Sequence, residues 1–422
     1  MMSATRVLIV GNGGREHALA WRLTHEGHEC FAAPGRAGYG EDAQCLTVGA
    51  SDPEALVAEA ERRQVQLAII GPEQPLVDGL ADQLRAAGIP TVGPSKAAAE
   101  LEGSKAAANR FMAAHDIPTA RSVTVTSLEQ GLAAIDEFEA PPVVKADGLA
   151  AGKGVTVADS KDEARQALRE CLEEDAFGGA GQTVVLEQRL YGQEVSLFVL
   201  TDGTHAATFL PAQDHTRLGE GDTGPNTGGM GAYVPAPIYD EVVADKVRTR
   251  IVEPSIAGLR AEGRPFVGVL FIGLMIDPDG EPWVIEYNCR FGDPEVQPLL
   301  FGLDTPLLPR LMAAATGELR DEQLPGRPAA TVVLASAGYP RSSRKGDRIS
   351  GLQALADDPD VKVFHAGTQA DGDGWATGGG RVLGVCARGS TLPEALDRAH
   401  AAAQSVQFDG RQLRRDIGAR AR

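Results

Sequence analysis

Residues 145–155 combine two lysines with three glycines in a pattern suited to phosphate binding. They read Lys-Ala-Asp-Gly-Leu-Ala-Ala-Gly-Lys-Gly-Val. The spacing is one residue shorter than that of a Walker A loop, and Gly154 stands where such a loop has the hydroxyl residue that binds Mg²⁺. Apolar runs at Pro142–Ala146 and Val155–Ala158 predict strands on both sides. We therefore expect a movable glycine loop between two strands, with a flexible hairpin and solvated lysines as the alternative.

Lysine is scarce in this chain, and half of it falls in one stretch. The sequence has 40 Lys and Arg residues, of which eight are lysines. Four of the eight lie within 58 residues, namely Lys96, Lys105, Lys145 and Lys153. This concentration indicates that the stretch binds an anion.

Three polar residues alternate at the end of an apolar run. Period two places Glu286, Asn288 and Arg290 on one face of a predicted strand, where burial in a core would be costly. A carboxylate and a carboxamide oxygen suit Mg²⁺, which takes few protein ligands and completes its shell with substrate phosphates. The pattern predicts a magnesium site, with a solvent-facing edge strand as the alternative.

Two glycine turns follow predicted strands near the N-terminus. The first is Gly11-Asn12-Gly13-Gly14 and the second is Gly71-Pro72-Glu73. The third glycine of a dinucleotide fingerprint is Glu16 here, which disfavours a nicotinamide enzyme. A glycine turn at a helix N-terminus still favours an anion such as phosphate through free N–H groups. A tight structural turn is the alternative.

Residues 211–237 are dense in Gly, Pro, Asp and Thr, and we expect a long loop there. Loops of this length are usually functional. Asp214 could accept a hydrogen bond from an ammonium group, or it could simply form an Asx turn. We assign no catalysis to the neighbouring His215 or to His17.

The elements around these residues predict an α/β protein of three domains. Strands and helices alternate up to residue 102, which implies βαβ units on a parallel sheet with ligands at the carboxyl ends of its strands. Residues 103–327 form the second domain, with a small inserted subdomain at about 119–192 and a hairpin of Val267–Ile276 with Pro282–Tyr287. Residues 328–422 form the third.

Composition excludes several classes of protein. The formal net charge of −18 argues against nucleic-acid and anionic-membrane partners, and no apolar run is long enough to span a bilayer. The five cysteines are scattered without a Cys-x-x-Cys pair, which disfavours a disulfide framework or structural zinc. The N-terminus leads directly into a strand pattern, so we expect a reduced, cytoplasmic protein.

Together these motifs resemble the glycinamide ribonucleotide synthetase (phosphoribosylamine–glycine ligase) family of the ATP-grasp superfamily. The resemblance extends along nearly the whole chain, and residues 221–233 carry its most specific motif. The other shared segments are Val10–Ala18, Gly71–Glu73, Val92–Lys96, Leu101–Lys105, Val144–Val155, Gln213–His215, Asn288–Glu295, Phe364–Thr368 and Arg415–Gly418.

The resemblance implies an ATP-grasp fold that binds ATP between the inserted subdomain and the hairpin. Lys105 and Lys145 would contact the phosphates beneath a lid loop that includes Gly148, Gly152, Lys153 and Gly154. Glu187 to Leu190 would contact adenine, Glu194 the ribose, and Glu286 with Asn288 would hold Mg²⁺ or Mn²⁺. The two glycine turns would help bind phosphoribosylamine, while Asp214, Arg290 and Gly292 would help hold the substrates.

The implied reaction joins glycine to 5-phosphoribosylamine at the expense of ATP, through glycyl phosphate, with Lys145, Asp214 and Arg290 taking part. Many ATP-grasp enzymes carry a third acidic metal ligand on the preceding strand, but Val267–Ile276 has none, so the number of metal ions stays open. Three alternatives remain: another ATP-grasp carboxylate–amine ligase or carboxylase, an inactive nucleotide-binding regulator, and, least favoured, a nicotinamide oxidoreductase.

Overall fold

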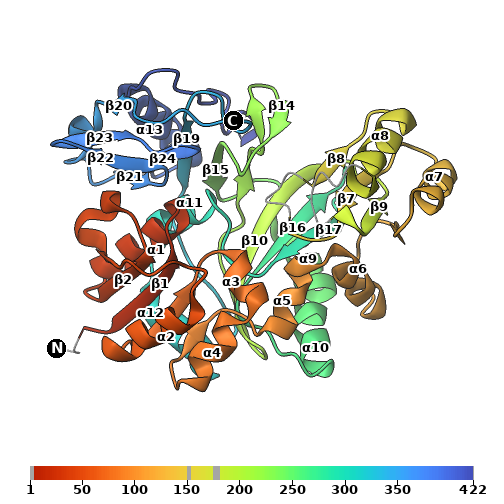
Figure 1. Cartoon of the computed structure of the whole chain (residues 1–422), viewed down its shortest axis with the longest axis horizontal. Helices are drawn as coiled ribbons and strands as arrows, with labels where there is room; N and C mark the ends of the chain where they lie inside the picture. The colour runs from red at the N-terminus through yellow and green to blue at the C-terminus, as the bar shows by residue number, and fades with distance from the viewer. Residues whose placement is uncertain (1–3, 150–153, 174–180, 422) are drawn as a thin grey trace.

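The structure is a computed structural model that describes residues 4–149, 154–173 and 181–421. Figure 1 shows an N-terminal unit and a C-terminal unit stacked on one side, a central sheet, and a small subdomain at the far side. The chain is α/β throughout, as predicted. Within the described ranges, no helix is both long and apolar enough to cross a membrane.

The N-terminal unit is a five-stranded parallel sheet in the order β3-β2-β1-β4-β5. Because the order reverses at β1 and β4, the turns after these two strands lie side by side, and Gly71 N–H donates to Val10 O at 3.0 Å. The strands are β1 (Arg6–Gly11), β2 (Glu29–Pro34), β3 (Gln44–Cys45), β4 (Leu67–Ile70) and β5 (Thr91–Val92), and the helices are α1 (Gly14–His25), α2 (Pro53–Arg62), α3 (Glu73–Asp78) and α4 (Leu80–Ala86).

A glycine interrupts the helical stretch at residues 73–86. Gly79 adopts a left-handed conformation (φ 95°) that divides the stretch into α3 and α4. A left-handed residue ends an α-helix at little cost when it is glycine. Two further helices, α5 (Lys96–Gly103) and α6 (Lys105–Ala114), then lead into the central part of the molecule.

The central sheet has the order β17-β16-β10-β11-β18 and contains the predicted antiparallel hairpin. Its strands are β10 (Gln193–Asp202), β11 (Ala206–Thr208), β16 (Val267–Ile276), β17 (Pro282–Asn288) and β18 (Glu322–Gln323). The helices that follow or flank these strands are α9 (Glu241–Val247), α10 (Glu253–Ala261), α11 (Val296–Gly302) and α12 (Leu308–Thr316), with a π-helical turn, Arg248–Val252, joining α9 to α10.

The inserted subdomain is an antiparallel sheet in the order β6-β9-β7-β8 with its own apolar core. The strands are β6 (Ser122–Val125), β7 (Val143–Ala146), β8 (Val155–Val157) and β9 (Val184–Glu187), and the helices are α7 (Leu128–Glu137) and α8 (Lys161–Leu172). A separate core lets this subdomain move as a unit against the central sheet.

The segment 211–237, expected as a loop, contains four short strands. Two of them enter the C-terminal sheet, whose order is β12-β15-β19-β24-β21, and the other two form a small hairpin. Pairing with β19 gives hydrogen-bond partners to backbone groups that an isolated glycine-rich segment would leave unpaired. The four are β12 (Gln213–Asp214), β13 (Arg217–Gly219), β14 (Thr223–Asn226) and β15 (Gly231–Val234).

The rest of the C-terminal unit packs α13 (Leu392–Ser405) against the sheet and adds a three-stranded sheet in the order β20-β23-β22. Its strands are β19 (Ala329–Ala335), β20 (Arg348–Ile349), β21 (Val361–His365), β22 (Thr368–Asp371), β23 (Gly374–Thr377) and β24 (Arg381–Arg388).

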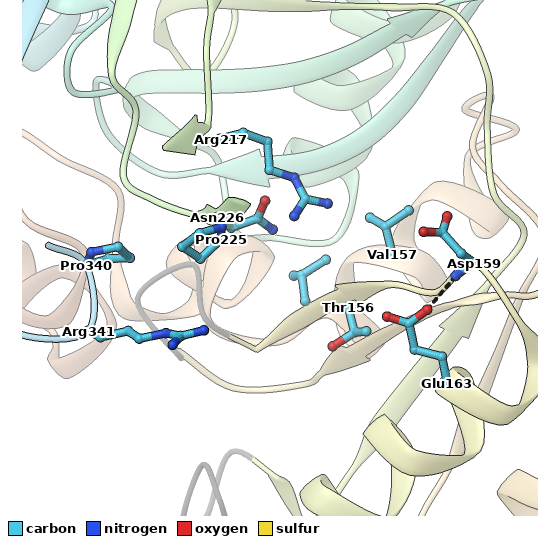
Figure 2. Close-up of a pocket in the computed structure, with 10 residues that line it drawn as sticks. Thr156, Val157, Asp159, Glu163, Arg217, Pro225, Asn226, Pro340 and Arg341 are labelled. Atoms are coloured by element: carbon cyan, nitrogen blue, oxygen red, sulfur yellow. Dashed lines mark hydrogen bonds between the residues drawn. The ribbon is translucent and has the colours of Figure 1, made fainter. Parts of the chain in front are cut away.

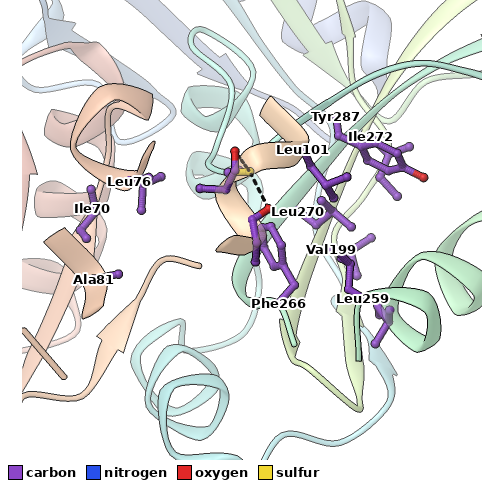
Figure 3. Close-up of a cluster of buried hydrophobic side chains, with 14 of the residues drawn as sticks. Ile70, Leu76, Ala81, Leu101, Val199, Leu259, Phe266, Leu270, Ile272 and Tyr287 are labelled. Carbon is purple, nitrogen blue, oxygen red and sulfur yellow. Dashed lines mark hydrogen bonds between the residues drawn. The ribbon is translucent and has the colours of Figure 1, made fainter. Parts of the chain in front are cut away.

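One apolar cluster runs from the N-terminal unit into the central sheet. Figure 3 shows side chains from α3 and α4 on one side and from β10, β16 and β17 on the other, with Leu101 and Phe266 between them. All are buried, and the burial of apolar surface contributes roughly 25 cal/mol per Å². The two units therefore share a core, which fixes the N-terminal glycine turns relative to the hairpin.

Candidate active site

Lys145 lies in a buried ion pair beside the predicted metal strand. Its side chain on β7 is 6% exposed, and its Nζ lies 2.5 Å from Glu187 Oε2 on β9. Nζ also donates to the Ile285 carbonyl at 3.2 Å, and Asn109 Nδ2 donates to the other Glu187 oxygen at 3.0 Å. Buried charges persist when they are paired and hydrogen-bonded. The structure thus brings together Lys145, Glu187 and the residue that precedes Glu286.

Lys105 begins helix α6, and the glycine loop caps that helix. The Asp147 carboxylate accepts hydrogen bonds from Ala106 N–H at 2.6 Å and from Ser104 Oγ at 3.0 Å. A carboxylate at this position satisfies helix N–H groups that lack partners within the helix. Considering only residues 4–149, 154–173 and 181–421, the Lys105 ammonium group has no hydrogen bond or ion pair, so it is available to a ligand.

Of the predicted lid residues, the structure describes Gly148 and Gly154. Ala146 N–H donates to Gly154 O at 2.8 Å, so the loop closes as the predicted β7–β8 hairpin. Gly148 is half-buried beside it. Gly152 and Lys153 lie outside the described residues.

Glu286, Asn288 and Arg290 share one face, as predicted from period two. Asn288 Nδ2 donates to Glu286 Oε1 at 3.1 Å, and Arg290 Nη2 donates to Asn288 Oδ1 at 3.0 Å. Tyr287 and Cys289 point to the opposite side and are 3% and 1% exposed. No cluster of three or more His, Cys, Asp or Glu suited to a metal occurs in the described part of the chain. A cation held by Glu286 and Asn288 would thus need oxygens from substrate or water.

Arg290 is enclosed by acidic residues of the N-terminal helices. Its guanidinium lies 2.8 Å from Glu102 Oε1 and 3.3 Å from Glu73 Oε2. Burial raises the pKa of Glu102, although Arg290 counteracts this effect. Burial acts in the same direction on Glu73, but Arg290 and Arg15 outweigh it and lower the pKa of that carboxyl. Sequence analysis missed Glu102, although this acid follows Leu101 in a helix with a largely apolar face.

Three further carboxylates, those of Asp214, Glu194 and Glu295, interact electrostatically with Glu286 or with one another. Burial, together with the negative charge of Glu286, raises the pKa of Asp214, even though Thr216 Oγ1 donates a hydrogen bond to it at 3.0 Å. The side chain of Glu194 is reached by water but lies in a recess, where desolvation and the charges of Asp214 and Glu286 raise its pKa to about 7. Burial and Asp214 likewise raise the pKa of Glu295 to about 8. Repelling carboxylates favour a bound cation.

The two glycine turns meet over the carboxylate of Glu16. Gly13 N–H donates to Glu16 Oε2 at 2.6 Å, so this one N–H of the turn is bonded within the protein. A Cβ placed on Gly11 would approach the Glu16 carboxyl carbon to 2.7 Å, and one on Gly71 would approach its oxygen to 2.0 Å. Both glycines are therefore required by Glu16, the residue that replaces the third glycine of the dinucleotide fingerprint. Asn12 is exposed at the tip of the first turn.

The turn after β17, at residues 291–295, closes against the first glycine turn. A Cβ on Gly14 would lie 3.3 Å from Asp293 Oδ1, and one on Gly292 would lie 2.6 Å from Glu295 Oε2. Asp293 and Glu295 were not identified from the sequence as site residues. Their position within three residues of Gly292 was the signal by which the sequence could have identified them. Leu190, expected near adenine, is half-buried where β9 leads into β10.

A cavity of about 430 Å³ opens between the subdomain and the small hairpin. Figure 2 shows Val157 and Thr156 of β8 on one wall and Arg217 with Asn226 of the β13–β14 hairpin on the other. Arg341 reaches in from the C-terminal unit. The subdomain and the glycine-rich segment therefore face each other across an open space.

Three domains of one family match the chain in the order that the fold displays. The N domain of phosphoribosylglycinamide synthetase matches residues 5–102, its ATP-grasp (A) domain matches 103–296, and its C domain matches 329–420. The chain belongs to the phosphoribosylglycinamide synthetase family. It is an ATP-grasp ligase, as the sequence motifs indicated, and not a nicotinamide oxidoreductase.

Individual relatives agree with the phosphoribosylglycinamide synthetase family. The phosphoribosylamine–glycine ligase of Vibrio cholerae is 48% identical over 422 residues, covering 99% of this chain and 98% of the relative. That of Salmonella typhimurium is 47% identical over 423 residues, with 99% and 98% covered. The crystal structure of phosphoribosylamine–glycine ligase from Thermotoga maritima matches with a TM-score of 0.86 and 33% identity, covering 98% of this chain and all of that one. The biotin carboxylase domain of Hydrogenobacter thermophilus 2-oxoglutarate carboxylase shares the fold alone, at 16% identity and a TM-score of 0.74. That match covers 97% of this chain and 91% of the carboxylase chain.

Proposed function

We propose that this chain ligates glycine to 5-phosphoribosylamine, converting ATP to ADP and phosphate and forming glycinamide ribonucleotide. The observation that carries this proposal is that Lys145, Glu187 and the Glu286–Asn288 pair lie together at strand β17, on a chain 48% identical to a phosphoribosylamine–glycine ligase over 99% of its length. Phosphoryl transfer needs positioning and charge neutralisation rather than a protein nucleophile. The lysines and the Glu286–Asn288 pair would supply this positioning and charge neutralisation.

The proposed ATP site consists of residues suited to bind the phosphates, the cation, the adenine and the ribose of the nucleotide. Lys105 and Lys145 bind the phosphates, and Glu286 with Asn288 would hold Mg²⁺ or Mn²⁺, which supplies further positive charge. The Glu187 carboxylate is occupied by Lys145 and Asn109, so contacts to adenine at Glu187–Leu190 use backbone groups. Glu194 binds the ribose hydroxyls. The loop that carries Gly148, Gly152, Lys153 and Gly154 covers the phosphates and excludes water from the reactive acyl phosphate.

The proposed glycine site uses Arg290 and Asp214. Arg290 holds the glycine carboxylate and Asp214 its ammonium group. A carboxylate oxygen attacks the γ-phosphorus, the bond to the bridging oxygen breaks, and ADP leaves. The amine of phosphoribosylamine then attacks the carbonyl carbon of glycyl phosphate, phosphate leaves, and the nitrogen loses a proton. Gly11 to Gly14, Gly71 to Glu73, and Gly292 surround the phosphoribosylamine.

Release of ADP under defined substrate combinations tests this proposal. ADP is measured with glycine alone, with phosphoribosylamine alone, and with both. Sustained turnover is expected only with both. Turnover that needs a different amine or carboxylate would favour another ATP-grasp ligase, and ATP binding without turnover would favour a regulator.

A further inference from the structure

Arg381 of the C-terminal unit reaches into the site from strand β24. A β-bulge between β19 and β24 lies directly beside it, and bulges redirect the side chains next to them. The guanidinium donates from Nη1 to the carbonyls of Gly228 and Asp293, and from Nη2 to Asp293 Oδ2 at 3.0 Å. One side chain thus ties together the glycine-rich segment, the turn after the metal strand and the C-terminal sheet.

Close packing in this junction explains two glycines of the most specific motif. A Cβ on Gly228 would lie 2.9 Å from Cζ of Arg381. Gly229 has φ +106°, and a Cβ there would lie 2.5 Å from Pro294 Cδ. Gly228 N–H also donates to Tyr339 Oη at 3.1 Å. The turn therefore needs glycine because the guanidinium and the proline approach its backbone directly.

Both oxygens of the Asp293 carboxylate are fixed in place. Arg381 holds Oδ2, while Gln297 Nε2 donates to Oδ1 at 2.8 Å. Gln297 is oriented in turn by Thr331 Oγ1, which donates to its Oε1 at 3.1 Å. The carboxylate is held in this orientation against Gly14 of the first glycine turn. A carboxylate held on both oxygens has little freedom to move when a ligand binds.

We propose that Arg381 is a positioning residue for the amine substrate. It holds Asp293 and the Gly228–Gly229 turn against the first glycine turn, and so completes the phosphoribosylamine side of the site. This inference rests on the proposed function, because it assigns the glycine turn to that substrate. It also gives the C-terminal unit a role in the reaction, through a residue that does not itself touch the reacting atoms.

We expect the effect to be specific to one substrate because no hydrogen bond joins Arg381 to those residues assigned to ATP that the structure describes. It makes no hydrogen bond to Lys105, Lys145, Glu286 or Asn288 in the described part of the chain. A lysine at this position would keep the charge but lose the planar fork that serves two acceptors at once.

The test compares Arg381→Gln and Arg381→Lys with wild type in steady-state kinetics for all three substrates. We expect Arg381→Gln to raise KM for phosphoribosylamine by about tenfold or more, with KM for ATP changed by less than about twofold. Arg381→Lys should lie between Arg381→Gln and wild type. The matched control is Arg348→Gln, because Arg348 forms only an exposed ion pair with Asp373 in the same unit and should behave as wild type.

Thermal midpoints are measured alongside, and Arg381→Lys decides the question if Arg381→Gln does not fold. An equal rise in all three KM values, or an unchanged KM for phosphoribosylamine, would overturn the positioning role. Failure of the proposed function is a separate result, since wild type itself would then show no ADP release dependent on the amine.

Discussion

At the scale of single residues, the site depends on charges that only their partners make tolerable. Lys145 and Glu187 are both nearly excluded from water and lie 2.5 Å apart. Arg290 is surrounded by acids in the same way. Removing one member of such a pair leaves the other buried and unpaired, which costs more than the pair itself contributes. Effects on stability and on ATP binding must therefore be separated.

For Lys145, two variants achieve this separation. Lys145→Met should lower the free energy of unfolding by about 3–5 kcal/mol because Glu187 is left without its partner. The double variant Lys145→Met with Glu187→Gln should recover most of that loss in urea unfolding. ATP affinity measured by calorimetry should stay weak in both. Wild-type ATP affinity in the double variant would show that Lys145 serves only the fold.

For the metal pair, Glu286→Ala should lower kcat/KM by about 10²-fold or more at low millimolar Mg²⁺, because the cation loses its carboxylate. Glu281→Ala is the control, since Glu281 precedes the same strand but forms ion pairs with Lys246 and Arg250 at the surface. Near-normal activity of Glu286→Ala in this assay would remove Glu286 from the proposed metal site.

Glu295 should make stability depend on pH. Burial and Asp214 raise its pKa from 4.5 to about 8, Asp293 adds to this shift, and Arg290 opposes it. The folded protein thus binds a proton that the unfolded chain releases, so this contribution to stability falls as pH rises from about 4.5 to about 8. Glu295→Gln should gain thermal midpoint relative to wild type between pH 5 and pH 8 without ligands, while keeping a hydrogen bond to Ser196. A difference in thermal midpoint between Glu295→Gln and wild type that does not change with pH would contradict the raised pKa of Glu295.

At the scale of elements, the glycine loop and helix α6 behave as one unit. Asp147 opens the loop and also accepts hydrogen bonds from the start of the helix that begins with Lys105, so the position of this lysine depends on the loop. The sequence showed the two lysines 40 residues apart (145 − 105) but not this connection. An Asp at a helix N-terminus typically stabilises the helix by about 1 kcal/mol.

Asp147→Ala should therefore weaken ATP binding by roughly fivefold to tenfold, which corresponds to about 1 kcal/mol of lost capping. The dissociation constant for ATP measured by calorimetry checks this. Asp162→Ala is the control, because Asp162 lies on α8 of the same subdomain and pairs with Arg165 at its surface. Equal ATP affinities for the two variants would show that capping by Asp147 does not determine how Lys105 binds ATP.

At the scale of the whole molecule, the C-terminal unit docks behind the first glycine turn through a buried polar network. His17 Nε2 lies 3.1 Å from Asp42 Oδ2, and Lys362 Nζ lies 2.9 Å from the same oxygen. His365 N–H donates to His17 Nδ1 at 2.7 Å, which leaves the proton of a neutral imidazole on Nε2. Burial lowers the pKa of His17 and favours this neutral form. The histidine that sequence analysis left without a role therefore joins two domains.

Asp42→Asn should loosen this docking because Lys362 and His17 lose their shared acceptor charge. We expect the opening free energy of strand β21 (Val361–His365) in hydrogen exchange to fall by about 1–3 kcal/mol. Asp373→Asn, at an exposed surface pair, is the control and should leave the exchange rates of β21 unchanged. Unchanged protection in Asp42→Asn would show that apolar contacts alone hold the domains together.

Predictions from the sequence succeeded where local pattern and local physics coincide. The prediction that Glu286, Asn288 and Arg290 share one side was confirmed, although a register shift precedes Glu286 and Arg290 lies beyond β17. Strand alternation and the hydrogen bonds among the three side chains together account for this placement. The expected loop at 211–237 was wrong because β13 and β14 pair with each other, while β15, which also pairs with β12, is held by β19, more than 90 residues away (329 − 234 = 95). The hydrogen bond from Gly13 N–H to Glu16 was not anticipated, because the local pattern does not show that the Glu16 side chain folds back onto the turn.

The sequence by itself determined the α/β architecture, the motifs of the family and the side chains able to bind phosphate and a divalent cation. These follow from periodicity, glycine spacing and residue chemistry, which act within a few residues along the chain. Only the tertiary structure decided that Asp147 accepts hydrogen bonds from the start of α6, that Glu102 faces Arg290, and that Arg381 reaches Asp293 from another domain. Such contacts join residues far apart in sequence, and their energies exist only once the shared core has brought the elements together.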